Sequence, residues 1–204
     1  MDLNLNSVSF TDVYLNRNVG YTVVGSPTIS NGVVSGFSSN NYVVIGSGFN
    51  ASDNYEIVIN AKPPSTSGGL VAQGIGGSAE LKLQFTTSLL RLYTSTTSAG
   101  NLTISNNFSM DIFYFVRLKR RGNIAYLDYS TDGKTWLGEV SMEFAQWNSS
   151  TNPITLGAIR NWNNVFNGEI DLTKSYIKVN GITFFNGKET ARTANYSLLY
   201  NGVS

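Results

Sequence analysis

The chain has 204 residues, with 14 Lys or Arg against 13 Asp or Glu, and a formal net charge of +1. This balance gives no electrostatic footprint for nucleic acid or an anionic membrane. The sequence contains no His and no Cys. Their absence excludes Ser-His-Asp and Cys-His nucleophiles, imidazole or thiolate zinc sites, and disulfides. The remaining side-chain chemistry belongs to carboxylates, hydroxyls and amides.

Residues 1–10 have neither the basic nor the apolar region of a secretory signal. No run reaches the roughly 18 apolar residues of a membrane span, so we expect no membrane insertion. The sequence is 41% hydrophobic and 12% aromatic, with 20 Gly and 4 Pro. This composition, rich in aromatics and turn formers, predicts many strands joined by tight turns.

Alternation of apolar and polar residues predicts strands along most of the chain. Residues 55–62 and 81–85 alternate most clearly, and the segment 63–69 between two such runs indicates a long hairpin loop. Residues 113–120 and 124–130 flank Arg121-Gly122, which predicts a hairpin because Gly tolerates a positive φ. A dozen or more short strands follow, at spacings typical of a sandwich or barrel.

One domain accounts for the whole pattern, since no change in composition marks a linker. We place this domain at residues 20–187. Residues 1–19 are expected to join the sandwich or to act as a tether. Residues 188–204 are expected to form a tail or an edge strand.

Three segments, residues 55–62, 113–136 and 154–181, carry a resemblance to a known family. FYFVRLKRRGNIAYLDYSTDGKTW (113–136) and ITLGAIRNWNNVFNGEIDLTKSYIKVNG (154–181) resemble the central hairpin and the closing strands of the concanavalin A-like lectin/glucanase superfamily, in its laminin G-like branch. The resemblance implies an all-β jelly-roll β-sandwich of two antiparallel sheets. Residues 167–181 and 20–45 also resemble phage tail and fibre proteins. A shared fold does not by itself name a function.

The first candidate site is the sequence Glu169-Ile170-Asp171-Leu172-Thr173. It resembles the E-x-D-x-E signature of laminarinase-type glucanases, with Glu169 in the nucleophile position and Asp171 in the orienting position. Thr173 occupies the acid/base position, where a hydroxyl does not cycle a proton near neutral pH. We therefore expect no catalytic residues and no enzyme activity. The alternative places Ile170 and Leu172 in the core, with both carboxylates facing solvent or turns.

Residues 130–136, Ser-Thr-Asp-Gly-Lys-Thr-Trp, resemble a shortened Asp-box turn. We interpret this turn as structural: Asp132 accepts backbone N–H bonds, and Trp136 packs beneath it in the core. The basic run Lys119-Arg120-Arg121 is interpreted as a solvated hairpin turn that protects a sheet edge, rather than a phosphate site.

The third candidate is a pair of loops in which Trp stands among amides. The ring of a Trp stacks on sugar C–H groups while amides bond the hydroxyls, so this pattern predicts a carbohydrate site. The candidate ligand-binding residues are Trp162, Asn161, Asn163, Asn164, Trp147 and Gln146. The alternative is that Trp162 folds back and caps the end of the sandwich.

No cofactor is expected, although laminin G-like domains often hold Ca²⁺, for which Asp53 and Asp111 are loop candidates. The resemblance implies a non-catalytic virion surface domain, from a phage tail, fibre or head decoration. Its partners would be a cell-surface glycan and other virion subunits, and a homo-oligomer is among the expected assemblies. The alternatives are a carbohydrate-binding module or adhesin on a bacterial or other extracellular surface, and a virion spacer without a ligand.

Overall fold

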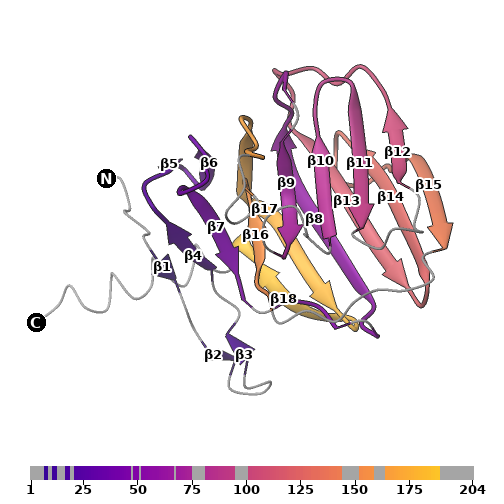
Figure 1. The fold of residues 1–204 in the computed structure, drawn as a ribbon, viewed down its shortest axis with the longest axis horizontal. Helices are drawn as coiled ribbons and strands as arrows, with labels where there is room; N and C mark the ends of the chain where they lie inside the picture. The colour runs from indigo at the N-terminus through magenta and orange to yellow at the C-terminus, as the bar shows by residue number, and fades with distance from the viewer. Residues whose placement is uncertain are drawn as a thin grey trace, which may run out of the picture.

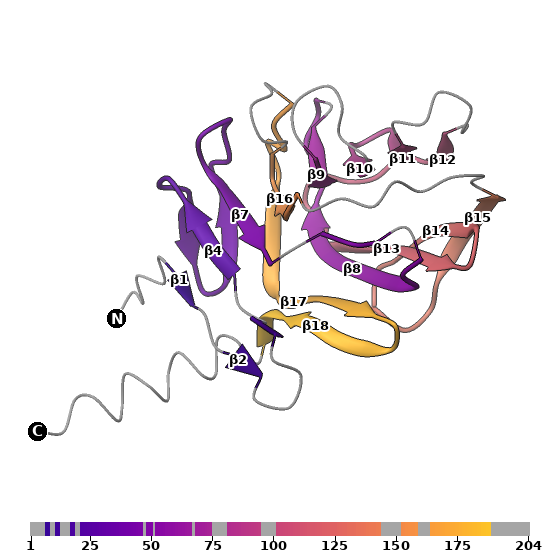
Figure 2. The ribbon, with the colours of Figure 1, turned by 60° about the horizontal axis from the view of Figure 1, so that its bottom comes forward.

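Two antiparallel sheets pack face to face in the computed structural model of this protein (Figures 1 and 2). The structure describes residues 7–8, 11–12, 17–18, 21–46, 48–50, 52–66, 68–74, 81–94, 101–143, 152–158 and 164–188. All pairs between the named strands are antiparallel. The predicted all-β jelly-roll sandwich is therefore confirmed.

Sheet 1 contains eight strands. In spatial order these are β1 (Ser7–Val8), β4 (Tyr21–Val24), β7 (Tyr42–Ile45), β16 (Ile154–Leu156), β9 (Gly69–Gln73), β10 (Leu81–Phe85), β11 (Leu89–Thr94) and β12 (Leu102–Ser105). Strand β1 pairs with β4 through Ser7 and Val8, so the segment before residue 20 contributes a strand to this sheet.

Sheet 2 carries the features that matter for function. Its strands in spatial order are β15 (Leu137–Glu143), β14 (Ile124–Ser130), β13 (Tyr114–Arg121), β8 (Tyr55–Lys62), β17 (Glu169–Val179), β6 (Val33–Ser35) and β5 (Thr28–Ser30), with β18 (Ile182–Asn186) paired to β17. The short strands β2 (Thr11–Asp12) and β3 (Arg17–Asn18) pair with each other in a separate two-stranded sheet.

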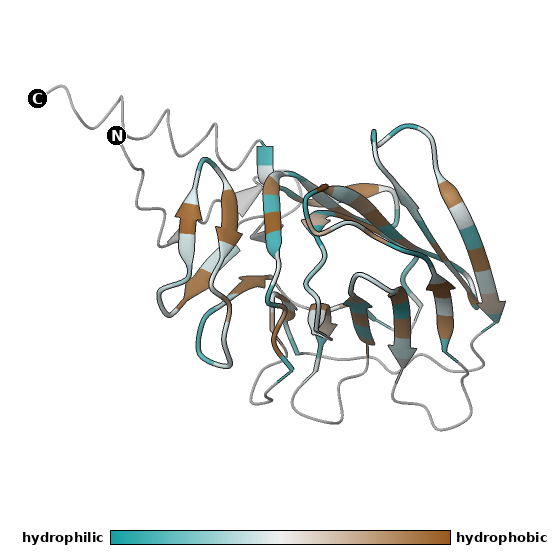
Figure 3. Ribbon diagram, turned by 90° about the horizontal axis from the view of Figure 1, so that it is seen from above, coloured by the Kyte–Doolittle hydropathy of each residue, from teal (hydrophilic) through white to brown (hydrophobic). Residues whose placement is uncertain are grey.

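The core lies between the sheets and follows the predicted alternation (Figure 3). Ile57 and Ile59 of β8 are fully buried, as are Leu118 of β13 and Leu83 of β10. Since successive strand residues point to opposite faces, the polar neighbours of these residues lie on the outward faces of the sheets. In the part of the chain that the structure describes, no helix has the length and apolar character needed to cross a membrane.

The predicted hairpin around Gly122 is confirmed. Strands β13 and β14 pair from Arg121↔Ile124 to Phe115↔Ser130, and Gly122 has a φ of 57°. A residue with a side chain is strained in that conformation, which explains why glycine stands there.

The prediction for residues 63–69 was wrong. These residues join β8 of sheet 2 to β9 of sheet 1, so they cross between the sheets and do not close a hairpin. Pro63 and Pro64 are buried, and Gly68 lies against the backbone of Val165, where a Cβ would come within 2.1 Å of the carbonyl oxygen. Alternation gives the face of each strand but not the sheet to which it belongs, which explains the error.

Three turns are tied together at the end of sheet 2 where β8 begins. Asn54 accepts a hydrogen bond from the Gly122 N–H at 2.7 Å, and its own N–H donates to the Asn180 side chain at 2.9 Å. Asp53 accepts from the Asn180 side chain at 2.9 Å. Arg120, only 4% exposed, donates to the carbonyls of Gly122 and Asp53. We call this group the clasp.

The clasp corrects the interpretation of the basic run as a solvated, edge-protecting turn. Arg120 is buried in the clasp, Lys119 is mostly buried on the outward face, and only Arg121 is exposed. The turn also joins β13 to β14, which are interior strands of sheet 2. The prediction treated the basic run as one unit, although alternate positions of a strand face opposite sides of the sheet.

Candidate functional site

A pocket of about 510 Å³ opens at the other end of β8, opposite the clasp end. Four segments from distant parts of the sequence meet there. Its lining residues are Ser35, Gly36, Phe37, Lys62, Pro63, Pro64, Ser65, Thr66, Met110, Asn167, Gly168 and Glu169. The lining thus combines hydroxyls, an amide and one cation–anion pair with apolar side chains, so it offers both hydrogen-bonding groups and apolar surface to a ligand.

The charged pair in the pocket consists of Lys62 at the end of β8 and Glu169 at the start of β17. The two residues are Cα partners in the sheet, and the Lys62 Nζ lies 3.4 Å from the Glu169 Oε2. Their side chains are 28% and 43% exposed. The pair is therefore open to solvent and offers a hydrogen-bond donor beside an acceptor.

An aromatic ring lies beside this pair. The Lys62 ammonium is 4.9 Å from the centre of the Phe113 ring, and the Lys174 ammonium lies 6.0 Å from the same centre. Both distances are within the range of cation–π attraction. Phe113 therefore borders the pocket through its contact with Lys62.

The carboxylates of the sequence motif have different surroundings. The Asp171 Oδ1 accepts bonds from the Thr173 N–H at 3.0 Å and the Thr173 hydroxyl at 2.6 Å, and its Oδ2 lies 3.0 Å from the Lys174 ammonium. Ile170 and Leu172 are buried in the core. The structural interpretation of this motif is confirmed, and the Thr173 hydroxyl serves Asp171. Glu169 alone of the two carboxylates lines the pocket.

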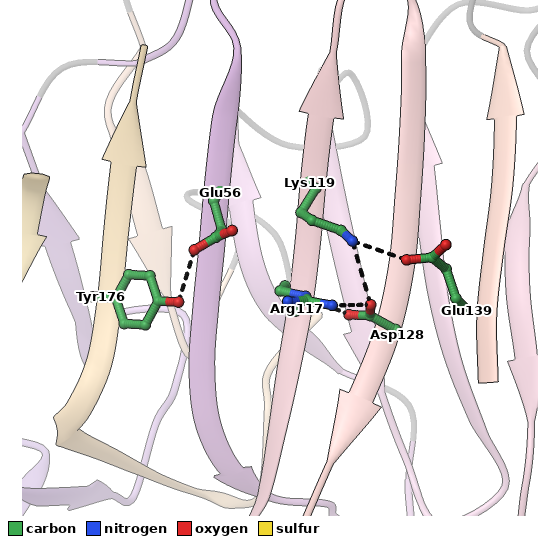
Figure 4. A network of polar contacts seen from close by, with 6 residues as sticks. All are labelled: Glu56, Arg117, Lys119, Asp128, Glu139 and Tyr176. Carbon is green, nitrogen blue, oxygen red and sulfur yellow. Dashed lines mark hydrogen bonds and ion pairs between the residues drawn. The ribbon is translucent and has the colours of Figure 1, made fainter. Parts of the chain in front are cut away.

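A second group of charged residues lies on the outward face of β13, β14 and β15 (Figure 4). Arg117 holds Asp128 with two hydrogen bonds, from Nε at 2.8 Å and from Nη2 at 2.5 Å. Lys119 lies 3.6 Å from Asp128 and 2.9 Å from Glu139. The Asp128 side chain has no solvent exposure. We call these four residues the ion-pair network.

Tyr176 of β17 and Glu56 of β8 form another contact in the same view (Figure 4). The Tyr176 hydroxyl donates to the Glu56 carboxylate at 2.7 Å. Partial burial and this bond to an anion raise the pKa of Tyr176 above its ordinary value. The hydroxyl therefore stays protonated and acts as a donor.

The Asp-box turn after β14 was predicted in part. The Asp132 Oδ1 accepts backbone bonds from Lys134 and Thr135, both at 2.8 Å, and one from the Ser130 hydroxyl at 2.8 Å. These bonds hold the pKa of the Asp132 carboxyl well below its usual range. The predicted structural role of Asp132 is confirmed.

Trp136 was placed in the core, and this was wrong. Its ring is half-buried on the outward face of sheet 2, with its centre 3.6 Å from the guanidinium carbon of Arg117. The turn ends in a cation–π stack over the ion-pair network, since Arg117 supplies a flat cation for the indole ring.

Most of the predicted carbohydrate loops lie outside the described residues, namely Trp162, Asn161, Asn163, Trp147 and Gln146. Asn164 is described. Its backbone carbonyl accepts a bond from the Gly69 N–H at 3.5 Å, and its side-chain oxygen is buried without a partner among the described residues. Asn164 does not line the pocket, although Asn167, three residues later, does.

The calcium candidates are both engaged in local turns. The carboxylate of Asp53 accepts from the Asn50 N–H at 2.8 Å and belongs to the clasp. The N–H of Asp111 donates to the Ser109 hydroxyl at 3.2 Å, and Asp111 is exposed. In the ranges that the structure covers, no three acidic side chains gather as a metal site.

Sequence reasoning missed the pocket because its lining comes from four separate segments. Lys62 is the last residue of an alternating run that predicts only a strand, and Ser35 and Met110 belong to no motif. One signal was present: Pro63-Pro64 follows the alternating run directly, and two residues without an N–H donor end a strand at that point.

No model of a known protein family and no curated protein matches the sequence. Solved structures match the fold. Domain 4 of AbnA, a GH43 extracellular arabinanase from Geobacillus stearothermophilus in complex with arabinotriose, is 12% identical with a TM-score of 0.57, over 93% of this chain and 97% of that chain. Domains LG4-5 of the mouse laminin alpha1 chain are 14% identical with a TM-score of 0.54, over 78% of this chain and 44% of that chain.

The binding domain of botulinum neurotoxin serotype D is 10% identical with a TM-score of 0.54, over 96% of this chain and 51% of that chain. The chain spans about half the length of the laminin and neurotoxin structures. At such identities the likeness establishes the fold alone. The chain therefore has the laminin G-like β-sandwich that its sequence predicted.

Proposed function

We propose that this protein binds carbohydrate, without cleaving it, in the pocket at the end of β8 and β17. The observation that carries the proposal is the open Lys62–Glu169 pair in a pocket that also presents hydroxyls, an amide and apolar side chains. Sugars expose hydroxyls that donate and accept together with apolar C–H faces. A cation–anion pair beside Met110 matches both properties.

The similarity to known structures supports this proposal. The arabinanase domain was solved with arabinotriose, and it is matched over nearly its whole length. Catalysis is not proposed, because a retaining glycosidase needs a second carboxyl group that exchanges a proton. Asp171 is instead held by Thr173 and Lys174.

The setting that we propose is a virion surface, where the domain contacts a cell-surface glycan, since residues 167–181 and 20–45 resemble phage tail and fibre proteins. Several copies on one particle would make weak single sites useful. A carbohydrate-binding module or adhesin of a bacterial surface protein fits the same pocket. The genes that flank this one distinguish the two settings: virion genes support the first, and their absence favours the second.

The test is binding of a broad glycan array by the wild type and by two pocket variants, Glu169→Gln and Lys62→Met. Removing one charge-assisted hydrogen bond costs roughly 1.5–3 kcal/mol, which corresponds to an affinity loss of about tenfold to a hundredfold. The matched control is Glu139→Gln, a carboxylate paired with a lysine outside the pocket, which should bind as the wild type does.

Two results would contradict the proposal. One is a folded wild type that binds no glycan on the array. The other is unchanged affinity in both pocket variants. A parallel assay of β-glucan cleavage by the wild type tests the absence of catalysis: release of reducing ends that is lost in Glu169→Gln would show that Glu169 is a catalytic residue.

A further inference from the structure

A row of outward side chains leads away from the pocket along β13. Phe113, Phe115, Arg117 and Lys119 stand at alternate positions, while the residues between them are buried in the core. Phe113 borders the pocket through Lys62. The pocket and the ion-pair network therefore lie on the same face of sheet 2, joined by one strand.

The distance along this row follows from strand geometry. Arg117 is four residues beyond Phe113, and a strand rises about 3.3 Å per residue, so the two positions are about 13 Å apart. This separation exceeds the size of one sugar ring. A short oligosaccharide, rather than a single sugar, would be needed to bridge it.

Trp136 lies over Arg117, the third residue of the row. The guanidinium of Arg117 is fixed by two bonds to Asp128 on the adjacent strand, and its side chain is only 15% exposed. The indole ring lies on this fixed plane at 3.6 Å. Because Arg117 and the Asp-box turn both hold it, the ring loses little freedom when a ligand stacks on it.

The charges beneath Trp136 favour a neutral ligand. Two cations, Arg117 and Lys119, face two carboxylates, Asp128 and Glu139. The pocket repeats this balance with Lys62 and Glu169. An acidic chain would have to displace a carboxylate from its cation to gain from either group, whereas a neutral chain meets no net charge at either.

An unpaired acceptor lies between the two ends of the row. Asn60 of β8 is the Cα partner of Phe115 and points to the same outward face. Its side-chain oxygen is buried and has no hydrogen-bond partner among the described residues. A buried oxygen without a partner destabilises the fold, and a sugar hydroxyl that reached it would satisfy it.

We propose that Trp136 forms a second sugar subsite on this face, and that the pocket and Trp136 together bind a stretch of a neutral glycan chain. Phe113 and Phe115 line the path between the two subsites. This inference rests on the proposed carbohydrate binding in the pocket and adds the length and the charge of the ligand.

The experiment uses an array that carries neutral glycans of one to eight units beside uronate and sialylated glycans of the same lengths. The wild type should bind neutral chains, and its affinity should rise steeply once a chain is long enough to reach Trp136. Trp136→Ala should weaken the long neutral chains about tenfold and leave the short ones unchanged. Trp136→Tyr, which keeps a ring, should restore most of the affinity, and it tests the subsite even where Trp136→Ala fails to fold.

The outcomes separate this inference from the proposed function. If Glu169→Gln loses binding but the wild type binds short and long chains equally well, the second subsite is overturned and the proposed binding in the pocket stands. The same conclusion follows if the wild type and both Trp136 variants bind long chains with equal affinity. Preference for uronate or sialylated chains would overturn the neutral ligand. A wild type that binds nothing would overturn both proposals.

Discussion

The same outward face of sheet 2 carries two ion pairs that differ in every physical respect. Arg117 and Asp128 are joined by two hydrogen bonds at 2.8 and 2.5 Å, with side chains 15% and 0% exposed. Lys62 and Glu169 approach only to 3.4 Å, with side chains 28% and 43% exposed. The first pair lies under an indole ring, and the second opens into a pocket.

The difference indicates separate roles for the two pairs. A buried, doubly bonded pair is shielded from a ligand by its burial, so it serves to fix the strands and to support the ring above it. An exposed pair is screened by water and contributes little to stability. Its groups exchange water for ligand hydroxyls at small cost. We therefore expect changes at Lys62 and Glu169 to affect ligand binding, and changes at Arg117 and Asp128 to affect the free energy of unfolding.

The largest effect is expected from Asp128→Ala. The change leaves the mostly buried Arg117 without its carboxylate, and breaking a buried pair from one side costs about 3 kcal/mol or more. Urea unfolding should show this decrease in the free energy of unfolding. The control is Glu139→Ala, whose carboxylate is 52% exposed and should cost well under 1 kcal/mol. Equal losses in the two variants would show that burial does not set the value of these pairs.

The strands of the sandwich could be predicted from the sequence because the alternation of apolar and polar residues follows the burial of their side chains. Tyr55, Ile57 and Ile59 point inward as the pattern predicts, and Gly122 forms the predicted turn. The partner sheet of each strand was not readable. Residues 63–69 lie between two alternating runs, and nothing local distinguishes a hairpin from a crossing between sheets.

Only those features of the site that a single segment of the sequence forms could be predicted. The Asp-box turn and the Glu169 motif are local, and the predicted bonds of Asp132 and the predicted burial of Ile170 and Leu172 are confirmed. Trp136 was misplaced because a Trp after a turn fits a core position as well as a stack on Arg117, which is 19 residues earlier in the sequence. Ser35 and Met110 reach the pocket only through the fold.

A smaller effect should appear in acid, from the turn that holds Trp136. The pKa of Asp132 is lower in the folded protein than its ordinary value near 4, because backbone N–H groups bond the ionised form. The stabilisation is complete above that ordinary value and is lost as the pH falls below it. Melting temperatures of Asp132→Asn should therefore lie below those of the wild type at pH 7 and converge with them in acid.

Glu139→Gln serves as the comparison for this acid dependence. Its hydrogen bond to Lys119 also lowers its pKa, but its side chain is half-exposed and lacks the backbone bonds of Asp132. Its melting curve should follow that of the wild type more closely over the same pH range. A gap between Asp132→Asn and the wild type that stays constant down to pH 2 would contradict a role for the charge of Asp132.

The smallest effect on stability is expected at the pocket, where the effect on binding should be large. Lys62→Met and Glu169→Gln each break a solvent-exposed pair at 3.4 Å, so each should change the free energy of unfolding by about 0.5 kcal/mol or less. Urea titrations of both variants, beside Asp128→Ala, give the comparison directly. A loss at Lys62 as large as that at Asp128 would mean that the pocket pair holds the strands together, and its weakened glycan binding would then reflect a damaged fold. Stability that stays level while affinity falls would instead assign Lys62 and Glu169 to the ligand.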